Sequence, residues 1–354
     1  MERESEATMA GSDARSPRKR ATMADIAEQL GISKAAVSYA LNDQPGVAAE
    51  TRDRVLALAH ELGWHASSSA RALSGAQTSV VGLVLSRPTD LLTVETFFIR
   101  FLAGLEQVLS ERGFSLLLRV IGDHPEEEIS TYERWWGERR IDGVILMDER
   151  VHDPRVNALT ELGLPAVLCG GPVSGLEFPC VWTDQAGDAA IAVQHLADLG
   201  HRSIGHVCGP TVFAHERARR RGVRRAAKAR GLDVETIEAS YTGPEAGKAT
   251  RRMLELQERP TALIFGSDTM AVAGLGAASE LGLRVPRDVS ALSWDDSTLT
   301  TLVQPSLTAL SRDTPGYGGL AASVLIDLIE GRNRGLVRAP LSTLQVRGST
   351  AEPF

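Results

Sequence analysis

The chain has 354 residues, of which 43% are hydrophobic, and a formal net charge of -7 at pH 7. This length suits two or three domains, and the acidic balance excludes a protein that coats nucleic acid indiscriminately while leaving room for a local DNA-binding module. No apolar run is long enough to span a membrane and the first twenty residues lack the apolar segment of a secretory signal, so we expect a cytoplasmic protein.

The first predicted element is a short helix that follows a polar segment. Residues 1–20 are charged and polar without an apolar period, and we expect them to form a disordered tail. The next residues show helical spacing, with Thr22 as the N-cap, Asp25 three positions later and Gly31 at the end. This pattern predicts a helix whose apolar positions are Met23, Ile26, Ala27 and Leu30.

Two more helices are predicted in the same domain. The second begins after Ser33 as its N-cap and stops at the turn signal NDQPG, and the third spans about 49–62 and is closed by Gly63. Because three short helices cannot bury much surface separately, we expect one shared core in a domain spanning 21–66. Residues 67–78, rich in Ser and Ala, then predict a linker.

From residue 79 to about 350, strand-like apolar runs alternate with helical segments. VVGLVL, DGVILM, SIGHVCG and ALIFGSD are examples of the runs. Repeated β-α-β units predict an α/β fold with parallel sheets that are covered by helices on both faces. The runs are too numerous for one sheet, so we expect two similar subdomains.

The first two helices and the tight turn at Gly31 predict a helix-turn-helix. The second helix of such a motif can enter the major groove of DNA and present its first residues to the base edges. Here the exposed residues would be Ser33, Lys34, Ala35, Ser38 and Tyr39. The alternative is a three-helix bundle without a ligand, which does not explain a linker to a large separate body.

The ordered motifs of the whole chain resemble one family. ATMADIAEQLGISKAAVSYALN, VAAETRDRVLALAHELGW and SSSARALSG are similar to the headpiece and hinge of the LacI/GalR family of bacterial transcription regulators. DGVIL, HLADLGHRSIGHVCG, PTALIFGSDTMA and GLRVPRDVSALSWDD continue the resemblance, which covers residues 21–350. An ordered set of motifs is far more specific than a lone helix-turn-helix.

The resemblance implies which residues contact DNA. The base-reading positions fall on Lys34, which can donate to guanine, and on Ala35 and Tyr39, of which Ala35 offers only apolar contact. In the family the linker forms a hinge helix on the operator, and its leucine, matched here by Leu73, opens a central minor-groove step. Phosphate contacts are expected from the polar residues Thr22, Ser33 and Ser38.

The resemblance also implies a body like that of periplasmic sugar-binding proteins, with a small ligand between two subdomains. We expect the N-subdomain at about 79–199 and 311–337, and the C-subdomain at about 200–310 and 338–350. A guanidinium and a carboxylate on opposite sides of the cleft would suit a polyhydroxylated ligand. The expected effector-binding residues are Phe97, Phe98, Asp184, Arg219, Tyr241, Ser267, Asp268 and Asp295.

Some of these residues have structural alternatives. Arg219 lies among many arginines, so it could belong to a solvated basic face, and Asp268 and Asp184 could each cap the helix that follows. One of Phe97 and Phe98 is expected in the core and the other in the cleft. The preceding segment SRPTDLLTVETFF departs from the family's usual Asn-Pro-Phe-Phe.

The sequence therefore predicts a homodimeric repressor that binds a palindromic operator in double-stranded DNA and is controlled by a small effector, expected to be a carbohydrate. A solute-binding receptor of the same fold without DNA-binding activity is the alternative. We expect no enzyme, cofactor or metal site, since no catalytic triad order, phosphate loop or metal-ligand spacing occurs. Cys169, Cys180 and Cys208 form no C-x-x-C pair and predict neither a disulfide framework nor a zinc site.

Overall fold

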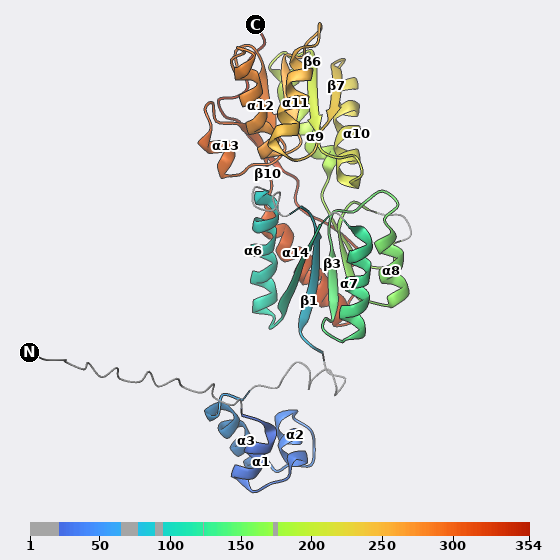
Figure 1. Cartoon of the computed structure of the whole chain (residues 1–354), viewed down its shortest axis with the longest axis vertical. Coiled ribbons are helices and arrows are strands. Elements are labelled where there is room, and N and C mark those ends of the chain that lie inside the picture. The colour runs from blue at the N-terminus through green and yellow to red at the C-terminus, as the bar shows by residue number, and fades with distance from the viewer. Residues whose placement is uncertain (1–20, 65–76, 89–94, 123, 173–175) are drawn as a thin grey trace, which may run out of the picture. The chain divides into compact units, whose positions relative to one another are not determined.

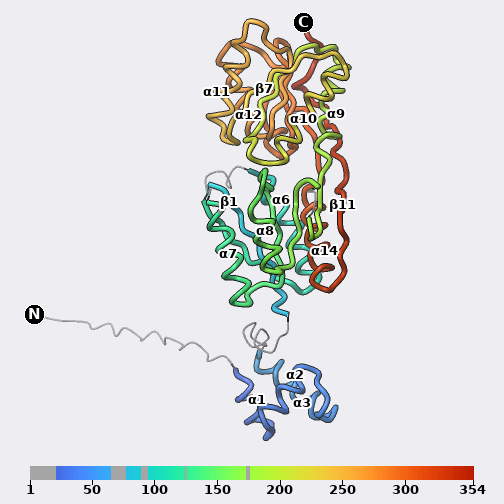
Figure 2. The backbone as a smooth tube through the Cα atoms, turned by 90° about the vertical axis from the view of Figure 1, so that its right-hand side faces the viewer, coloured from blue at the N-terminus to red at the C-terminus, as the bar shows by residue number. Residues whose placement is uncertain are grey.

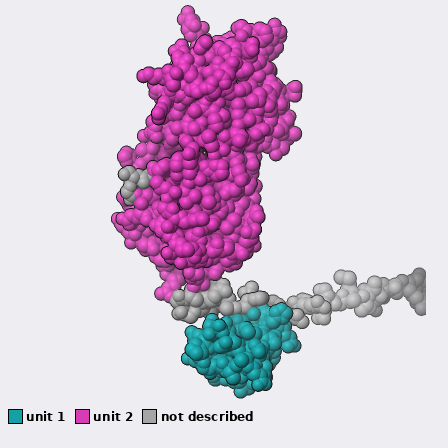
Figure 3. Space-filling model, turned by 180° about the vertical axis from the view of Figure 1, so that it is seen from behind, with its two compact units in different colours: residues 1–76 teal, residues 77–354 magenta. Residues whose placement is uncertain are grey.

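The computed structural model describes residues 21–64, 77–88, 95–122, 124–172 and 176–354. The expected tail and most of the expected hinge, including Leu73, lie outside the described residues. The chain divides into two compact units, residues 1–76 and 77–354, coloured teal and magenta in Figure 3. Each unit has a hydrophobic core of its own.

The described part of the first unit contains α1 (Met23–Leu30), α2 (Lys34–Leu41) and α3 (Ala49–Glu61). The Thr22 side chain accepts a hydrogen bond from Asp25 N, and Asp25 Oδ2 accepts from Thr22 N at 2.6 Å, which is a complete capping box. Gly31 ends α1 at a φ of 64°, where glycine is unstrained. The core that joins the three helices consists of Ile26, Ala27, Val37, Ala40, Val55 and Ala59.

The second unit has two lobes, each built on a six-stranded sheet. In the first lobe the strands are parallel and follow the order β11-β5-β4-β3-β1-β2. Their bounds are β1 (Val80–Ser86), β2 (Ser115–Ile121), β3 (Gly143–Leu146), β4 (Ala166–Gly170), β5 (Cys180–Trp182) and β11 (Leu336–Arg338).

Helices cover both faces of the first sheet (Figure 1). On one face lie α6 (Thr96–Glu111) and α14 (Thr314–Ile329), and on the other lie α7 (Pro125–Gly137) and α8 (Pro154–Leu162). The backbones of α6 and α14 approach so closely that a Cβ atom at Gly104 would lie 1.8 Å from the Pro315 carbonyl oxygen. This contact requires glycine and holds α6, whose first turn carries Phe97 and Phe98, against the lobe.

The second lobe repeats this plan with the strand order β12-β10-β9-β8-β6-β7, in which only β12 runs antiparallel to its neighbour. One face packs against α11 (Gly243–Leu254) and α12 (Asp268–Glu280), and the other against α9 (Gln185–Asp198) and α10 (Ala214–Lys228). The short α13 (Thr298–Leu302) follows β9. The strand bounds are β6 (Ser203–Cys208), β7 (Asp233–Glu238), β8 (Ala262–Phe265), β9 (Ser290–Ser293), β10 (Thr308–Ser311) and β12 (Thr343–Gln345).

The chain passes between the lobes three times, after β5, after β10 and after β11. The expected boundary at 199/200 placed α9 in the first subdomain, but α9 packs beside α10 in the second lobe, as Figure 2 shows. The boundary therefore falls between β5 and α9. Burial of Ala189, Ala192, Val193 and Leu196 against the second sheet is the physical reason.

The predicted α/β fold with two parallel-sheet subdomains behind a helix-turn-helix is confirmed. None of the helices in the described ranges is long and apolar enough to cross a bilayer.

Candidate functional site

The start of α2 carries the side chains expected to meet DNA. Ser33 is the N-cap, and its Oγ accepts a hydrogen bond from Ala36 N at 3.1 Å. Lys34, Ala35 and Tyr39 are exposed, while Val37 and Ala40 point into the core. Burial of one face of α2 thus leaves the opposite face free for a groove of DNA.

Three expected phosphate contacts are partly occupied by local bonds. The Thr22 and Ser33 hydroxyls cap α1 and α2, which places both helix N-termini, with their backbone N–H groups, at the surface. The Ser38 carbonyl oxygen accepts from Asn42 Nδ2 at 2.9 Å, so its backbone helps to end α2. The Ser33 hydroxyl can still donate to a phosphate, because capping uses only its acceptor role, whereas the Thr22 hydroxyl already donates to Asp25 Oδ2 at 2.8 Å.

The second unit holds a cleft between its lobes, lined from the carboxyl ends of both sheets. At one edge the lobes meet through two hydrogen bonds: Thr96 Oγ1 donates to Asp268 Oδ2 at 3.1 Å, and Arg100 Nη1 donates to the Asp296 carbonyl oxygen at 2.7 Å. Seven of the eight expected effector residues line this cleft, namely Phe97, Phe98, Arg219, Tyr241, Ser267, Asp268 and Asp295.

A backbone contact joins the lobes at another edge. Arg150 forms an antiparallel bridge with Phe213, and Ala214 N donates to the Glu149 carbonyl oxygen at 2.8 Å. These two segments follow β3 and β6, so the loops beyond the carboxyl ends of two strands from different lobes contact each other.

Arg219 lies on the inner face of α10 and is only 6% exposed, which excludes the solvated basic face. Its Nη1 donates to Glu216 Oε1 at 2.7 Å and to the Gly266 carbonyl oxygen at 3.0 Å, and its Nε donates to Gln185 Oε1 at 2.9 Å. The guanidinium also lies 4.9 Å from the centre of the Trp294 ring. A cation held on so many sides is oriented before any ligand arrives.

The helix cap that the sequence suggested for Asp268 is made by its neighbour Ser267. Ser267, not Asp268, is the N-cap of α12, since its Oγ accepts from Met270 N at 3.2 Å. Asp268 is the first residue of the helix and accepts from Thr96 across the cleft. The Asp268 carboxylate therefore links the two lobes.

Asp184 is the one expected effector residue outside the lining. Its Oδ1 accepts from Gly187 N at 2.8 Å as the N-cap of α9, and its Oδ2 lies 2.6 Å from Arg338 Nη2. Asp184 is therefore a helix cap, which was the alternative interpretation of this residue. Its neighbours Thr183 and Gln185 line the cleft instead. A capping side chain turns back onto its own helix, away from the end of the strand.

Tyr241 lines the cleft as expected, whereas the expected division of Phe97 and Phe98 between core and cleft holds only in part. Both Phe97 and Phe98 line the cleft, and Phe98 belongs to the core of the first lobe at the same time. Tyr241 donates from its hydroxyl to Glu216 Oε1 at 2.9 Å and lies 2.9 Å from His215 Nε2. Burial, followed by the nearby arginines Arg219 and Arg87, holds the pKa of His215 well below its ordinary value, so this imidazole is neutral at pH 7.

Sequence reasoning missed Arg87, which enters the cleft directly after β1. Its guanidinium carbon lies 5.4 Å from the Phe98 ring, 4.6 Å from the Phe213 ring and 5.4 Å from the Tyr241 ring, and its Nη2 lies 3.1 Å from Asp148 Oδ1. Three aromatic faces and a carboxylate thus fix one cation. Arg87 and Asp148 each follow a parallel strand of the first sheet, and that position was the available signal.

Two carboxylic acids of the cleft titrate near neutral pH. Burial raises the pKa of Glu95 to about 7, although Arg87 opposes the shift. Burial and the charge of Asp268 raise the pKa of Asp295 to about 6, and Arg219 opposes that shift. Desolvation outweighs pairing at both groups, so Glu95 takes up a proton near pH 7 and Asp295 takes one up near pH 6.

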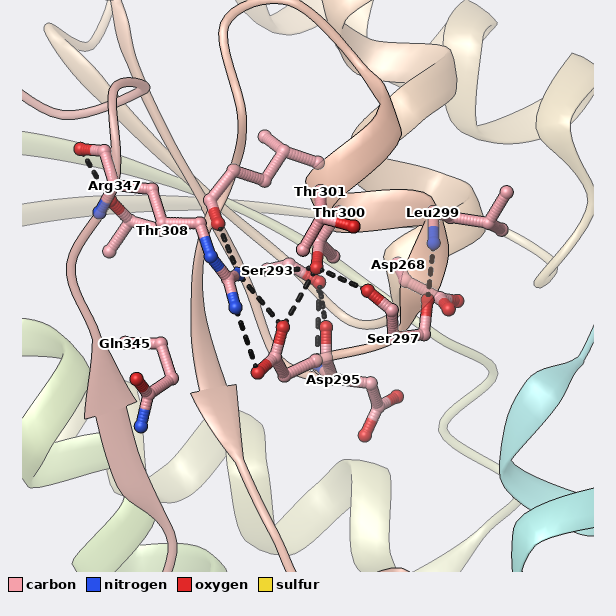
Figure 4. A network of polar contacts seen from close by, with 12 residues as sticks. Asp268, Ser293, Asp295, Ser297, Leu299, Thr300, Thr301, Thr308, Gln345 and Arg347 are labelled. Atoms are coloured by element: carbon pink, nitrogen blue, oxygen red, sulfur yellow. Dashed lines mark hydrogen bonds and ion pairs between the residues drawn. The ribbon is translucent and has the colours of Figure 1, made fainter.

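The loop that carries Asp295 and Asp296 is held from several directions (Figure 4). Ser293 Oγ donates to the Asp295 carbonyl oxygen at 2.7 Å, and Arg347 Nη2 donates to Asp296 Oδ2 at 3.0 Å. Thr300 Oγ1 donates to Asp296 Oδ1 at 2.8 Å. These bonds connect the loop to α13 and to the segment after β12, and they fix the backbone that carries the Asp295 carboxyl.

A buried carboxylate joins the crossings between the lobes. Asp188 of α9 is 1% exposed, and its oxygens accept from Arg312 Nη2 at 2.6 Å and from Ser342 N at 3.1 Å. Arg312 lies in the crossing after β10, and Ser342 lies in the crossing after β11. The Asp188 carboxylate therefore connects both crossings to α9, the helix that follows the crossing after β5.

The lining as a whole favours an uncharged, hydrogen-bonding ligand. It contains four arginines and five carboxylic acids, which nearly cancel, together with the rings of Phe97, Phe98, Tyr241 and Tyr317. No group of three or more His, Cys, Asp or Glu side chains in the described ranges could hold a metal ion. A helix-turn-helix joined to a two-lobed body with such a cleft defines a DNA-binding regulator with an effector domain.

Comparisons with known proteins agree with this class. Residues 22–67 match the family of bacterial regulatory proteins of lacI type, and residues 193–350 match the periplasmic binding protein-like domain. The HTH-type transcriptional regulator CelR of Thermobifida fusca is 31% identical over 94% of this chain and 99% of its own length. MalR of Streptomyces coelicolor is 33% identical over 93% and 96%. The chain therefore belongs to the LacI family of bacterial regulatory proteins, whose members are transcription regulators and not enzymes.

A solved structure shows the same fold with a sugar. The CelR–cellobiose complex is 29% identical to this chain, with a TM-score of 0.72, and the match covers 93% of this chain and all of that one.

Proposed function

We propose that this protein is a transcription repressor that acts in the cytoplasm as a homodimer on a palindromic operator and releases or binds that operator in response to a small carbohydrate. The observation that carries the effector class is the cleft lining, with its nearly balanced arginines and carboxylic acids and its aromatic rings. Paired donors and acceptors bind adjacent hydroxyl groups, and aromatic rings pack on the apolar face of a sugar. The cellobiose bound to CelR supports this class.

We propose two kinds of DNA contact, one from α2 in the major groove and one from Leu73 in the minor groove. Lys34 would donate to guanine, Ala35 and Tyr39 would make weaker contacts, and the leucine wedge at Leu73 would supply specificity at the centre of the operator. Two identical headpieces read two half-sites, so the operator should be an imperfect palindrome.

The Leu73→Ala variant tests DNA binding. We expect specific operator affinity to fall about 10- to 100-fold, because the loss of a wedge forfeits a few kcal/mol of contacts that the bend permits. A gel-shift titration with the palindrome selected by the native protein from random duplexes measures this. Dimerisation, followed by sedimentation, and sugar binding should stay unchanged, and an undiminished operator affinity contradicts the wedge.

A thermal-shift screen tests the effector class. The native chain is mixed with D-glucose, D-galactose, D-xylose, cellobiose, maltose, adenine, hypoxanthine and guanosine, and a bound ligand raises the melting temperature through mass action. We expect a rise with at least one sugar and none with the purines. A response to a purine without any response to sugars would overturn the carbohydrate proposal.

A further inference from the structure

Three buried polar atoms of cleft-lining residues have no hydrogen-bond partner among the described residues, namely Arg87 Nε, Arg312 Nε and Glu95 Oε2. Two of them, the donor Arg87 Nε and the acceptor Glu95 Oε2, face each other. The two atoms lie 3.8 Å apart, which is too long for a hydrogen bond. An unsatisfied donor and an unsatisfied acceptor are costly in a buried site, and their occurrence side by side calls for a group that satisfies both.

The donor is held in place by its surroundings. The guanidinium of Arg87 contacts the rings of Phe98, Phe213 and Tyr241, and its Nη2 faces Asp148. It cannot turn toward Glu95 without losing these contacts. The Nε–H group is therefore oriented in advance.

The acceptor is equally confined. Glu95 is the N-cap residue of α6, its side chain is only 11% exposed, and it makes no capping hydrogen bond. Its carboxyl lines the cleft together with Arg87. A side chain that neither caps its helix nor pairs closely with the adjacent cation has its hydrogen-bonding capacity left for a ligand.

We infer that one hydroxyl group of the bound effector lies between Arg87 and Glu95, accepting a hydrogen bond from Arg87 Nε and donating one to Glu95 Oε2. This inference rests on the proposed function, because it assumes a small hydroxylated effector in the cleft. Arg87 and Glu95 both belong to the first lobe, whereas Phe213 and Tyr241 cover Arg87 from the second lobe. The hydroxyl thus enters while the lobes are apart and is enclosed when they meet.

The chemistry of this position selects for a hydroxyl. A carboxylate or phosphate placed there would face Glu95 and Asp148, and an ammonium group would face Arg87. A hydroxyl oxygen donates and accepts through one atom, which an amide nitrogen cannot do. Arg87 and Glu95 therefore act as determinants of specificity for one hydroxyl of the effector.

The test measures coupling between Glu95 and single hydroxyl groups. The tightest ligand among D-glucose, D-galactose, D-xylose, cellobiose and maltose, and each of its monodeoxy analogues, is titrated by calorimetry into the native chain and into Glu95→Ala and Glu95→Gln. For one analogue we expect the native chain to lose about 10- to 100-fold in affinity, the range of a hydrogen bond to a charged group. Glu95→Ala should bind the parent sugar more weakly than the native chain does. It should also discriminate against that analogue less strongly, because only the hydrogen bond from Arg87 Nε to the hydroxyl remains. Glu95→Gln should recover part of the affinity.

Glu106→Ala is the matched control, because Glu106 is exposed on the same helix. It should discriminate the analogues as the native chain does. If Glu95→Ala and the native chain lose affinity in parallel for every analogue, while both keep the same melting temperature without sugar, the inference is wrong and the proposed function stands. If none of the five sugars binds the native chain, the carbohydrate proposal fails first, and this inference with it.

Discussion

In the Arg155→Met variant, the free energy of unfolding is expected to fall by about 3 to 5 kcal/mol, the range for removing one partner of a buried ion network. Arg155 is 1% exposed in the first lobe. Its Nη1 donates to Glu128 Oε1 at 2.6 Å, its Nε donates to Asp153 Oδ1 at 2.8 Å, and its Nη2 donates to the Asp148 carbonyl oxygen at 2.9 Å. Methionine fills a similar volume but leaves two carboxylates in the interior with less compensation.

The effect of Arg155→Met on the free energy of unfolding should also depend on pH. Burial alone would raise the pKa of Asp153, but the hydrogen bonds and charge of Arg155 hold it below its ordinary value. In the native chain this depressed pKa contributes stability that is fully present above the unfolded value and is lost only as pH falls through the folded value. Without Arg155, burial dominates and the pKa rises, so the variant gains stability as its carboxyls take up protons. The difference in the free energy of unfolding between the native chain and the variant should therefore become smaller as the pH falls from 7 to 5.

Urea unfolding followed by circular dichroism at both pH values measures these differences. Arg140→Met is the control, because Arg140 is about half exposed and pairs with exposed Glu138, and the stability of this variant should stay within about 0.5 kcal/mol of the native chain. A loss below about 1 kcal/mol for Arg155→Met, or a deficit that grows as pH falls, would show that the network adds little to stability.

Replacement of Arg219 by methionine is expected to abolish the effector response. If the guanidinium makes two charge-assisted hydrogen bonds to the sugar, its loss weakens binding at least 100-fold, since such bonds contribute about 1.5 to 3 kcal/mol each. The same change leaves Glu216, which is fully buried, without its cation, although Gly209 N and the Tyr241 hydroxyl still donate to it. The free energy of unfolding should therefore fall as well, by about 3 kcal/mol.

A double variant separates binding from folding. Glu216→Gln combined with Arg219→Met removes both buried charges, so stability should recover in part while sugar binding stays lost. Calorimetry with the sugar found in the thermal-shift screen and urea unfolding give the two readouts. Arg221→Met, on the exposed side of α10, should change neither. Sugar affinity retained in the double variant would remove Arg219 from the effector site.

Local interactions explain why much of the fold could be predicted. The Thr22 capping box, the Ser33 cap and the glycine at the end of α1 act within four residues, so the sequence shows them directly. The strand–helix alternation of the body likewise reflects burial on both faces of parallel sheets. Several cleft residues were found because they match family motifs that follow strands, as Ser267 and Asp268 follow β8.

The missed residues depend on contacts between distant segments. Arg87 belongs to the cleft because rings from α6, from the segment before α10 and from the segment after β7 surround it. Asp184 caps α9, as the alternative interpretation expected, but its pairing with Arg338, which is 154 residues away, has no local pattern. The rings around Arg87 have none either, although its place directly after a strand was a local signal.

By itself, the sequence determined the order of the elements, the caps of α1 and α2, the family and the exposed face of α2, because each depends on spacing within a few turns or on ordered motifs. Only the tertiary structure decided that α9 belongs to the second lobe, that Asp188 joins the crossings and that Asp268 links the lobes. Those outcomes arise from burial and pairing across the sheets, where the free energy depends on which surfaces meet in space and not on which residues are neighbours in the chain.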